Sequence, residues 1–220
     1  MKLFDEYPYM KSDTVVLKKM GAADADALSD MVKNEQLYRY LPTFLYEQKY
    51  DDIQEMLAKM DEECFLPKES LLLGIYVKRP ASAPAEELTA VPSSAEQTAA
   101  VPWQFAGIAE FYHYEEKKAK VSIGCRLLPA FWGQGLATAV IGMMKDYLFT
   151  QTDIRTITGH IMQANRASAG AAMKNGFLCK YPGLLEDWGF PQLVRIDKYV
   201  FKKAWITASE NQTGERKNWQ

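Results

Sequence analysis

Apolar and polar residues alternate along several short stretches of this chain, and a period of two residues predicts strands. The clearest stretch is 121–127, where Val121, Ile123, Cys125 and Leu127 alternate with small or polar residues. Further alternating or continuously apolar runs predict strands over these ranges: 14–19, 71–78, 103–112, 155–162, 177–181 and 193–202. The pattern therefore predicts a sheet of about seven strands.

Between these stretches the apolar residues recur at the spacing of a helix. The longest such segment is 136–149, where Val140, Met144 and Leu148 belong to one apolar face. Segments of the same kind predict helices over the following ranges: 22–34, 51–60 and 166–175. Helices and strands mixed in this order predict a fold of the α+β (mixed α/β) class.

Residues 80–102 differ from the rest of the chain, because they are rich in Ala, Pro, Ser, Glu and Thr and poor in large apolar side chains. Such a segment does not bury enough apolar surface to offset its ordering entropy. We predict a flexible insertion between two strands, with a partner-binding segment as the alternative. Residues 209–220 predict a polar tail. Residues 1–208 are therefore predicted to form a single domain.

Composition and charge narrow the class of protein. Of the 220 residues, 48% are apolar and 25% are charged, as in ordinary globular domains with ample length for a core. The net charge of −2 argues against broad, charge-driven binding of nucleic acid. No apolar run reaches the length of a membrane span, and the acidic segment Met1–Glu6 does not resemble a signal peptide.

Cysteine and histidine usage bears on the compartment and on metals. The chain has three cysteines without a CxxC pair and only two histidines. This usage predicts reduced thiols, a cytoplasmic protein and no metal site. We expect Cys125 and Cys179 to behave as small buried apolar residues.

The run from Trp132 to Thr138 connects a predicted strand to the longest predicted helix through Gly133 and Gly135. Glycines at such a junction let the backbone approach a ligand closely. The first amides of the helix are unpaired and carry its positive dipole end. The junction therefore predicts a site for a phosphate or pyrophosphate, although it is neither the GxxxxGK[ST] loop nor a GxGxxG loop in an opening βαβ unit.

The same junction resembles the Q/R-x-x-G-x-G/A signature of the GNAT superfamily of N-acetyltransferases. Gly135 and Ala137 occupy the last two signature positions, and Trp132 stands where Gln or Arg is usual. Two later segments resemble the family's N-x-x-S and K-x-G-F segments: Asn165-x-x-Ser168 and Lys174-Asn175-Gly176-Phe177. The resemblance extends over about residues 10–204, apart from the insertion, and is strongest to the branch of ribosomal-protein N-terminal (alanine/serine) acetyltransferases.

The resemblance implies a central, mostly antiparallel, splayed sheet flanked by helices, with acetyl-CoA as acyl donor and no metal. The pantetheine arm is expected in a gap between the strand ending at Leu128 and the strand from Arg155. A backbone amide near Leu127 or Leu128 is expected to stabilise the oxyanion. The residues expected to hold the cofactor are Leu127, Leu128, Trp132, Gly133, Gln134, Gly135, Leu136, Ala137, Thr138, Asn165, Ser168 and Lys174. For Asn165, helix capping alone is the alternative.

The resemblance also implies direct transfer to a primary amine, without a covalent Ser or Cys. The branch often has a Glu just before the Ile-Gly pair of the strand, and here that position is Ser122. Glu110 is our first candidate for the base, with a solvated strand carboxylate as the alternative. His160 is the second, with a structural histidine as the alternative. Tyr181 is a candidate to protonate the leaving thiolate, with a rim or core tyrosine as the alternative.

The acceptor is either a protein N-terminus or a small-molecule amine, and the enzyme is expected to be a monomer or homodimer. Trp188 and Tyr46 are candidates to line the acceptor side, or simple lids. The segment 47–63 is acidic, which indicates a solvated face or a polycationic acceptor. Its acidic residues are Glu47, Asp51, Asp52, Glu55, Asp61, Glu62 and Glu63. The Ser122 departure leaves a second function open, a non-catalytic acyl-CoA-binding sensor or interaction module.

Overall fold

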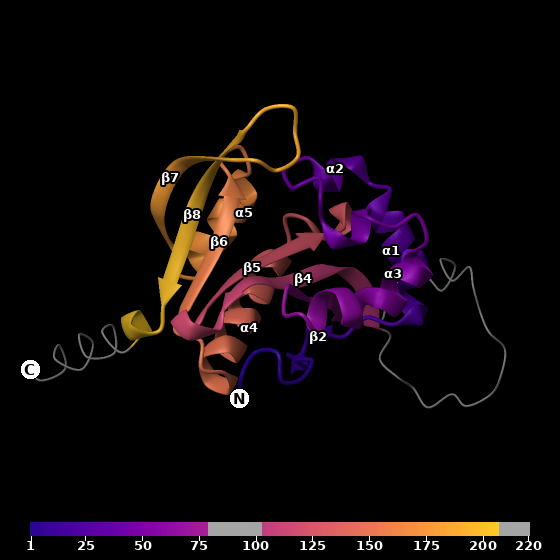
Figure 1. Ribbon diagram of the computed structural model, residues 1–220, viewed down its shortest axis with the longest axis horizontal. Coiled ribbons are helices and arrows are strands. Elements are labelled where there is room, and N and C mark those ends of the chain that lie inside the picture. The colour runs from indigo at the N-terminus through magenta and orange to yellow at the C-terminus, as the bar shows by residue number, and fades with distance from the viewer. Residues whose placement is uncertain (79–102, 207–220) are drawn as a thin grey trace, which may run out of the picture.

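The computed structural model describes residues 1–78 and 103–206, so the insertion predicted at 80–102 and the tail predicted at 209–220 lie outside the described residues. The described chain forms one sheet of eight strands in the order β1-β2-β3-β4-β5-β6-β8-β7, flanked by helices (Figure 1). Neighbouring strands are antiparallel except for β5 and β6, which are parallel. The predicted α+β class is confirmed.

The strands follow the predicted ranges and differ mainly at their ends. Their bounds are β1 (Met10–Lys11), β2 (Val15–Lys18), β3 (Ser70–Lys78), β4 (Trp103–Glu115), β5 (Lys120–Leu127), β6 (Thr156–Met162), β7 (Leu178–Glu186) and β8 (Val194–Lys202). The prediction of about seven strands was one short. The strand it missed is β1, whose two residues are too few for an alternating pattern to show.

The main helices also lie where helical spacing predicts them. Their bounds are α1 (Ala25–Val32), α2 (Glu35–Tyr38), α3 (Ile53–Met60), α4 (Leu136–Gln151) and α5 (Arg166–Lys174). The shorter helical turns are η1 (Ala22–Asp24), η2 (Tyr46–Gln48), η3 (Asp61–Phe65), η5 (Glu116–Lys118) and η6 (Pro129–Phe131). The helix predicted over 22–34 ends earlier because Asn34 caps α2, its side chain accepting from the Leu37 amide. Within the described ranges, no helix is long and apolar enough to cross a bilayer.

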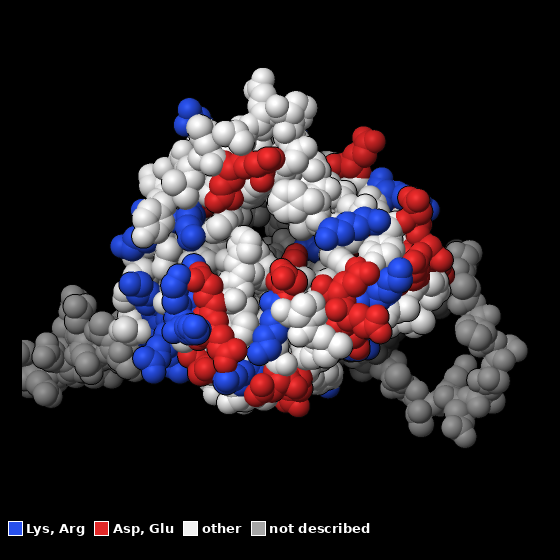
Figure 2. Space-filling view, in the orientation of Figure 1, with Lys and Arg blue, Asp and Glu red and all other residues white. Residues whose placement is uncertain are grey.

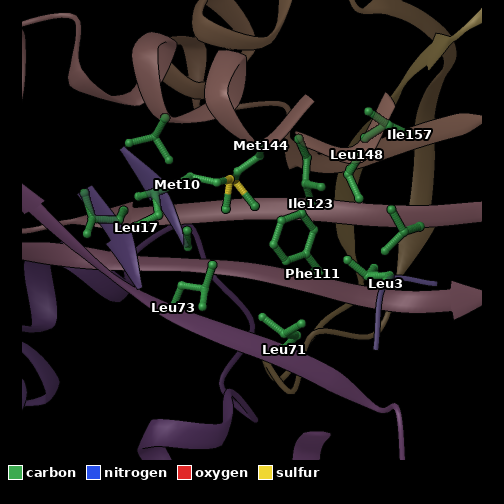
Figure 3. Close-up of a cluster of buried hydrophobic side chains, with 14 of the residues drawn as sticks. Leu3, Met10, Leu17, Leu71, Leu73, Phe111, Ile123, Met144, Leu148 and Ile157 are labelled. Carbon is green, nitrogen blue, oxygen red and sulfur yellow. The ribbon is translucent and has the colours of Figure 1, made fainter. Parts of the chain in front are cut away.

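The alternation of side chains across the strands divides the core into two apolar layers. On one face Leu73, Phe111 and Ile123 pack against Met144 and Leu148 of α4 (Figure 3). On the opposite face, residues of β3 and β4 pack beneath the helices of the N-terminal segment; they include Leu72, Tyr76, Phe105 and Ile108. The β2–β4 part of the sheet is therefore covered on both faces.

The splay arises because β5 and β6 pair over a short length. Their parallel register holds only from Lys120, opposite Thr156, to Ser122, opposite Thr158. At the last pair the two hydroxyl oxygens lie 2.7 Å apart. Beyond it β5 continues to Leu127 beside β4, whereas β6 diverges with β8 (Figure 1). The predicted gap between these two strands is confirmed.

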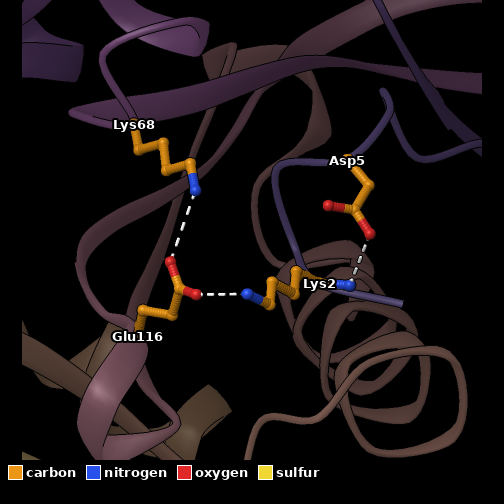
Figure 4. A network of polar contacts seen from close by, with 4 residues as sticks. All are labelled: Lys2, Asp5, Lys68 and Glu116. Carbon is orange, nitrogen blue, oxygen red and sulfur yellow. Dashed lines mark hydrogen bonds and ion pairs between the residues drawn. The ribbon is translucent and has the colours of Figure 1, made fainter.

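Away from the gap, the N-terminal segment is tied to the sheet by Leu3, which is fully buried. Its Lys2 ammonium lies 2.5 Å from Glu116, which also pairs with Lys68, and the Lys2 amide donates to Asp5 (Figure 4). These side chains are largely exposed, and solvent screening leaves such ion pairs little effect on stability. Burial of Leu3, rather than the ion pairs, anchors this segment.

Candidate active site

A cleft of about 1260 Å³ lies where β5 and β6 separate, and Figure 2 shows the surface hollowed near its centre. The volume exceeds the ~300–1,000 Å³ of a typical small-molecule pocket. One half is lined by β5, the start of α4, β6 and α5. The other half is lined by α2, the chain after it, β4 and the loop after β7. The cleft therefore has room for two reactants that meet at the open edge of β5.

The glycine junction forms one wall of the cleft. Gly135 is the N-cap residue of α4 with φ 80°, and Gly133 has φ 74°, both in the left-handed region that favours glycine. A Cβ at either position meets nothing within 4 Å, so packing does not exclude a side chain. No side chain caps α4, and the unpaired amides of its first turn offer donors to an anion.

Most residues predicted to hold the cofactor line the cleft, namely Leu127, Trp132, Gly133, Gly135, Leu136, Ala137, Thr138, Asn165, Ser168 and Lys174. The exceptions are Leu128 and Gln134. Leu128 packs against the apolar layer beneath the N-terminal helices. Gln134 turns away, and its side-chain amide donates to the Ala130 carbonyl at 2.7 Å. The structure therefore does not bring these two side chains to the cleft.

The edge of β5 presents backbone groups to the gap. The Leu128 amide donates to the Ala106 carbonyl of β4 at 2.9 Å. Because antiparallel pairs alternate between bonded and non-bonded positions, Leu127, opposite Gly107, turns its backbone groups away from β4. Its carbonyl accepts from Trp132 Nε1 at 2.7 Å. Of the two amides predicted as oxyanion donors, the Leu127 amide faces the gap and the Leu128 amide is already bonded.

Asn165 is the N-cap of α5, and its side-chain oxygen accepts from the Ser168 amide at 3.1 Å. The capping role considered for Asn165 is confirmed. Both residues also line the cleft, and their contact with a cofactor stays a prediction.

Replacing Asn165 with Ala is expected to lower the free energy of unfolding by about 1 kcal/mol, because the Ser168 amide loses its acceptor. Asn165→Asp keeps an acceptor and is the matched control, expected to stay within about 0.5 kcal/mol of wild type. Urea unfolding measures both changes. Equal midpoints for Asn165→Ala and wild type would contradict the capping role.

Three charged side chains meet at the base of the cleft. Arg126 Nε and Nη2 lie 2.5 and 2.6 Å from the two carboxylate oxygens of Glu47. Arg126 Nη1 donates to Glu110 Oε2 at 2.7 Å. The exposed fractions of the Glu47, Arg126 and Glu110 side chains are 0%, 4% and 12%. Tyr38 also donates its hydroxyl to Glu47 at 3.2 Å. A buried cluster of this kind persists only because each charge is paired.

Glu110 lies in the cleft, as predicted, and the alternative of a solvated strand carboxylate is wrong. Burial raises the pKa of the Glu110 carboxyl; the Arg126 guanidinium opposes this rise, and the negative charge of Glu47 adds to it. A carboxylate whose pKa is raised is a better proton acceptor near neutral pH. The position of Glu110 therefore suits a general base.

His160 also lines the cleft, with Nδ1 3.5 Å from Glu186 Oε1. Glu186 in turn accepts from Trp188 Nε1 at 2.9 Å. Within the described chain, His160 Nε2 is buried without a hydrogen-bond partner. Burial lowers the pKa of the His160 imidazole and favours its neutral form. A neutral imidazole in the cleft keeps His160 open as the second candidate base.

Tyr181 is not among the described residues that line the cleft. It lies on β7, the edge strand, and is 56% exposed. On the same strand the prediction of a buried Cys179 is wrong, because this cysteine is exposed. The β7–β8 register is irregular between Cys179 and Tyr181, and few side chains of this edge strand are covered. Cys125 is half-buried and lines the cleft.

The half of the cleft lined by α2 and the loop after β7 is closed by a contact between two loops. The Trp188 carbonyl accepts from both the amide and the hydroxyl of Thr43, at 2.9 and 3.2 Å. Gly189 makes this approach possible, since a Cβ there would lie 1.9 Å from Thr43 Oγ1. Trp188 and Tyr46 are buried and line the cleft, and their contact with an acceptor stays a prediction.

The buried pairing of Arg126 with Glu47 was not predicted from the sequence. The role of Arg126 could have been predicted from the alternating pattern. Arg126 lies on the same face of the strand as Ser122 and Gly124, and an arginine on a buried face needs a partner of opposite charge. Nothing in the sequence predicted the burial of Glu47, because Glu47 begins an acidic segment and such segments usually form a solvated face. In the part of the chain that the structure describes, no three His, Cys, Asp or Glu side chains group to hold a metal ion.

Comparison with known proteins identifies the family of the chain. The family described as acetyltransferase (GNAT) domain matches residues 14–178, which is most of the chain. The chain therefore belongs to the GNAT acetyltransferase family, as its motifs predict, and its enzyme class is N-acetyltransferase.

Individual relatives are distant in sequence. An uncharacterized N-acetyltransferase, YoaA of Bacillus subtilis (strain 168), is 20% identical over 195 residues, 89% of this chain and 96% of that protein. A structure of RimL, a ribosomal L7/L12 α-N-protein acetyltransferase with coenzyme A, is 18% identical with a TM-score of 0.68, over 89% of this chain and 98% of that one. A spermidine N-acetyltransferase from Vibrio cholerae with CoA and spermine is 12% identical with a TM-score of 0.65, over 88% and 98%. These two structures share the fold.

Proposed function

We propose that this protein transfers an acetyl group from acetyl-CoA directly to a primary amine. One observation carries the proposal: a single cleft joins the glycine junction of α4, the open edge of β5 and the buried Glu110 carboxyl. When bound, acetyl-CoA supplies an acetyl group activated as a thioester. The coenzyme A complexes of two proteins with the same fold support this choice of donor.

The half of the cleft lined by β5, the start of α4, β6 and α5, here called the donor half, fits this cofactor. Backbone amides from Gly133 to Thr138 provide donors for a pyrophosphate at the positive end of a helix dipole. The free edge of β5 offers Cys125 and Leu127 backbone groups to the peptide-like pantetheine arm, as a strand edge does for an added strand. Lys174, which also lines the cleft, adds a positive charge to this half.

The residues between the two halves stabilise the negative charge that develops on the thioester carbonyl and accept the proton of the amine. The Leu127 amide donates to the carbonyl oxygen on which negative charge develops. Glu110 takes a proton from the attacking amine as the C–N bond forms. The C–S bond then breaks, and coenzyme A leaves as a thiolate that takes up a proton from solvent. Ser122 does not compete as the base, because it is buried against Thr158.

The other half of the cleft, lined by α2, the chain after it, β4 and the loop after β7, is here called the acceptor half. The cleft as a whole is lined by five acidic residues, namely Glu63, Glu69, Glu110, Glu186 and Asp187, and by five basic ones, namely Arg39, Lys49, Arg126, Arg166 and Lys174. The acidic side chains offer partners to an ammonium group before it loses its proton. A polyamine and a protein N-terminus both carry such a group, and both are classes of acceptor named for proteins with the same fold.

Turnover against a panel of amines tests the proposal. The panel includes polyamines, amino acids and peptides with free Ala or Ser N-termini, and release of the CoA thiol reports transfer. We expect acetyl-CoA to be consumed only when an accepted amine is added. Tight acetyl-CoA binding without thiol release on any amine would instead favour the acyl-CoA-binding sensor.

Replacing Gly135 with Val is expected to weaken acetyl-CoA binding at least about tenfold, because the side chain enters the space in front of the first α4 amides and their charge-assisted bonds are lost. Gly183→Val is the matched control, since Gly183 has φ 70° and a Cβ there makes one contact at 3.8 Å. Both variants carry about 1–2 kcal/mol of left-handed strain. Calorimetry should show lost affinity in Gly135→Val only; equal affinities would contradict a pyrophosphate site at the glycine junction.

A further inference from the structure

Glu47 is a buried acid that the transfer reaction, as described above, does not use. It lies in η2, its side chain has no exposed surface, and it does not line the cleft. It cannot touch either reactant. Burying a carboxylate lowers the stability of the fold unless partners of opposite charge lie close to it. The contacts of Glu47 therefore indicate its role.

The contacts of Glu47 fix the orientation of Arg126. Arg126 Nη2 donates to Glu47 Oε2 at 2.6 Å. The other carboxylate oxygen lies 2.5 Å from Nε as an ion-pair contact, without the alignment of a hydrogen bond. Because the carboxylate lies along one edge of the guanidinium, these two contacts restrict its rotation. Only the Nη1 edge of Arg126 is then directed at Glu110, where it binds Oε2 at 2.7 Å. Among the described residues no donor contacts Glu110 Oε1. Glu110 therefore has one oxygen anchored and one oxygen free in the cleft.

The same arrangement balances the charge next to Glu110. A buried guanidinium beside a carboxylate stabilises the ionised form and weakens it as a base. Glu47 places a second negative charge against that guanidinium and offsets this effect. Arg126 therefore anchors Glu110 without removing its ability to accept a proton.

We propose that Glu47 is a positioning residue for acetyl transfer: it holds Arg126 in place and offsets its charge, so that Glu110 presents one free carboxylate oxygen to the acceptor amine. The inference rests on the proposed function, in which Glu110 takes the proton. Glu47 acts on the reaction only through Arg126.

Other titratable groups also face this cluster and bear on any dependence on pH. Arg126 comes from β5, and His113 and Tyr112 come from the same strand as Glu110. Cys64 of η3 lies within electrostatic range of Glu110, and Tyr38 of α2 donates to Glu47. None of these groups changes in the variants compared below, with the exception of the Tyr38 control.

The test compares Glu47→Gln with wild type. Loss of the Glu47 charge leaves Arg126 less offset, which lowers the pKa of Glu110 and makes it a weaker base. We therefore expect kcat to fall at least about tenfold and the acidic limb of its pH profile to move down by about one pH unit. KM for acetyl-CoA should stay within about twofold, since the donor half is untouched.

Two further variants separate charge from packing. Tyr38→Phe removes only one hydrogen bond to Glu47 and is expected to leave the pH profile in place with a small loss of stability. Glu47→Asp keeps the charge but shortens the side chain; we expect a lower kcat with the acidic limb near its wild-type position. If Glu47→Gln does not fold, Glu47→Asp tests the inference instead. A lower kcat together with an unmoved acidic limb supports it, and a wild-type kcat overturns it.

A measurement that needs no turnover distinguishes failure of this inference from failure of the proposed function. The Glu110 carboxyl is titrated by NMR in labelled wild-type protein and in Glu47→Gln, with Glu110→Gln identifying its signal. A lower Glu110 pKa in Glu47→Gln supports the inference even if the amine has not been found. An unchanged Glu110 titration, or a folded Glu47→Gln variant with wild-type kcat and pH profile, overturns it. Full activity of Glu110→Gln would instead refute the assignment of the base.

Discussion

Replacing Glu110 with Gln is expected to lower kcat by about 10²–10⁴-fold, the usual contribution of a positioned general base. The amide keeps the shape of the side chain but accepts no proton near neutral pH. Its carbonyl oxygen still accepts from Arg126 Nη1, which is 2.7 Å from Glu110 in the wild-type protein. The fold and the affinity for acetyl-CoA should therefore be preserved, and the loss should fall on kcat alone.

Steady-state rates and calorimetric titration of acetyl-CoA check this expectation together. Glu115→Gln is the matched control, because Glu115 lies on the same strand as Glu110 but pairs with Lys118 and Lys120 outside the cleft. It should keep the wild-type rate. If Glu110→Gln also keeps it and His160→Gln does not, the base is His160, whose neutral imidazole lies in the same cleft.

Replacing Arg126 with Met is expected to cost about 3–5 kcal/mol of stability, because two buried carboxylates then share one site without a cation. Methionine fills much of the same volume, so the loss reflects charge rather than an empty space. Burial already raises the pKa of Glu110, and the Arg126 guanidinium is the main group that opposes this rise. Without the guanidinium, the pKa of Glu110 rises further. The folded state then favours the protonated carboxyl over the ionised one.

The sign of this effect gives a second check on Arg126→Met. Since the folded pKa of Glu110 lies above its unfolded value, stability falls as the pH rises from about 4 toward neutrality. Urea unfolding at pH 5 and pH 7 should therefore show the larger loss at pH 7. The double variant Glu47→Gln with Arg126→Met removes one of the two carboxylates and should recover part of the stability. A loss below about 1 kcal/mol at pH 7 for Arg126→Met alone would contradict the buried cluster.

Local patterns were enough to predict the parts of the protein that depend on neighbouring residues in the chain. Alternation in 121–127 located β5 and its faces, and helical spacing located α4. The two glycines between them predicted a junction with positive φ, which Gly133 and Gly135 have. Alternation around Glu110 also placed this carboxylate on the face that lines the cleft.

Contacts between distant segments were not predictable in the same way. Glu47 is buried because Arg126, far along the chain, lies beneath it, and the acidic composition around Glu47 indicated the opposite environment. Tyr181 and Cys179 are exposed because β7 is the last strand of the sheet, and the order of strands is a tertiary property. The sequence pattern predicted the strand itself but not its place at the edge.

The buried cluster links the N-terminal segment to the reaction site. Arg126 of β5 connects Glu47, which follows α2, to Glu110 of β4. Under the proposed function, the helical segment that covers the acceptor half therefore also holds the base in place through the charge of Glu47. A change in that segment is expected to affect turnover as well as the choice of amine.

Calorimetric titration with acetyl-CoA and with S-acetylpantetheine, which lacks the pyrophosphate, tests the central claim most directly because it does not depend on the acceptor. We predict saturable one-to-one binding of acetyl-CoA and at least about tenfold weaker binding of S-acetylpantetheine, since charge-assisted bonds at the start of α4 are worth about 1.5 kcal/mol or more. Equal affinity for the two compounds, or no saturable binding of acetyl-CoA, would contradict the account.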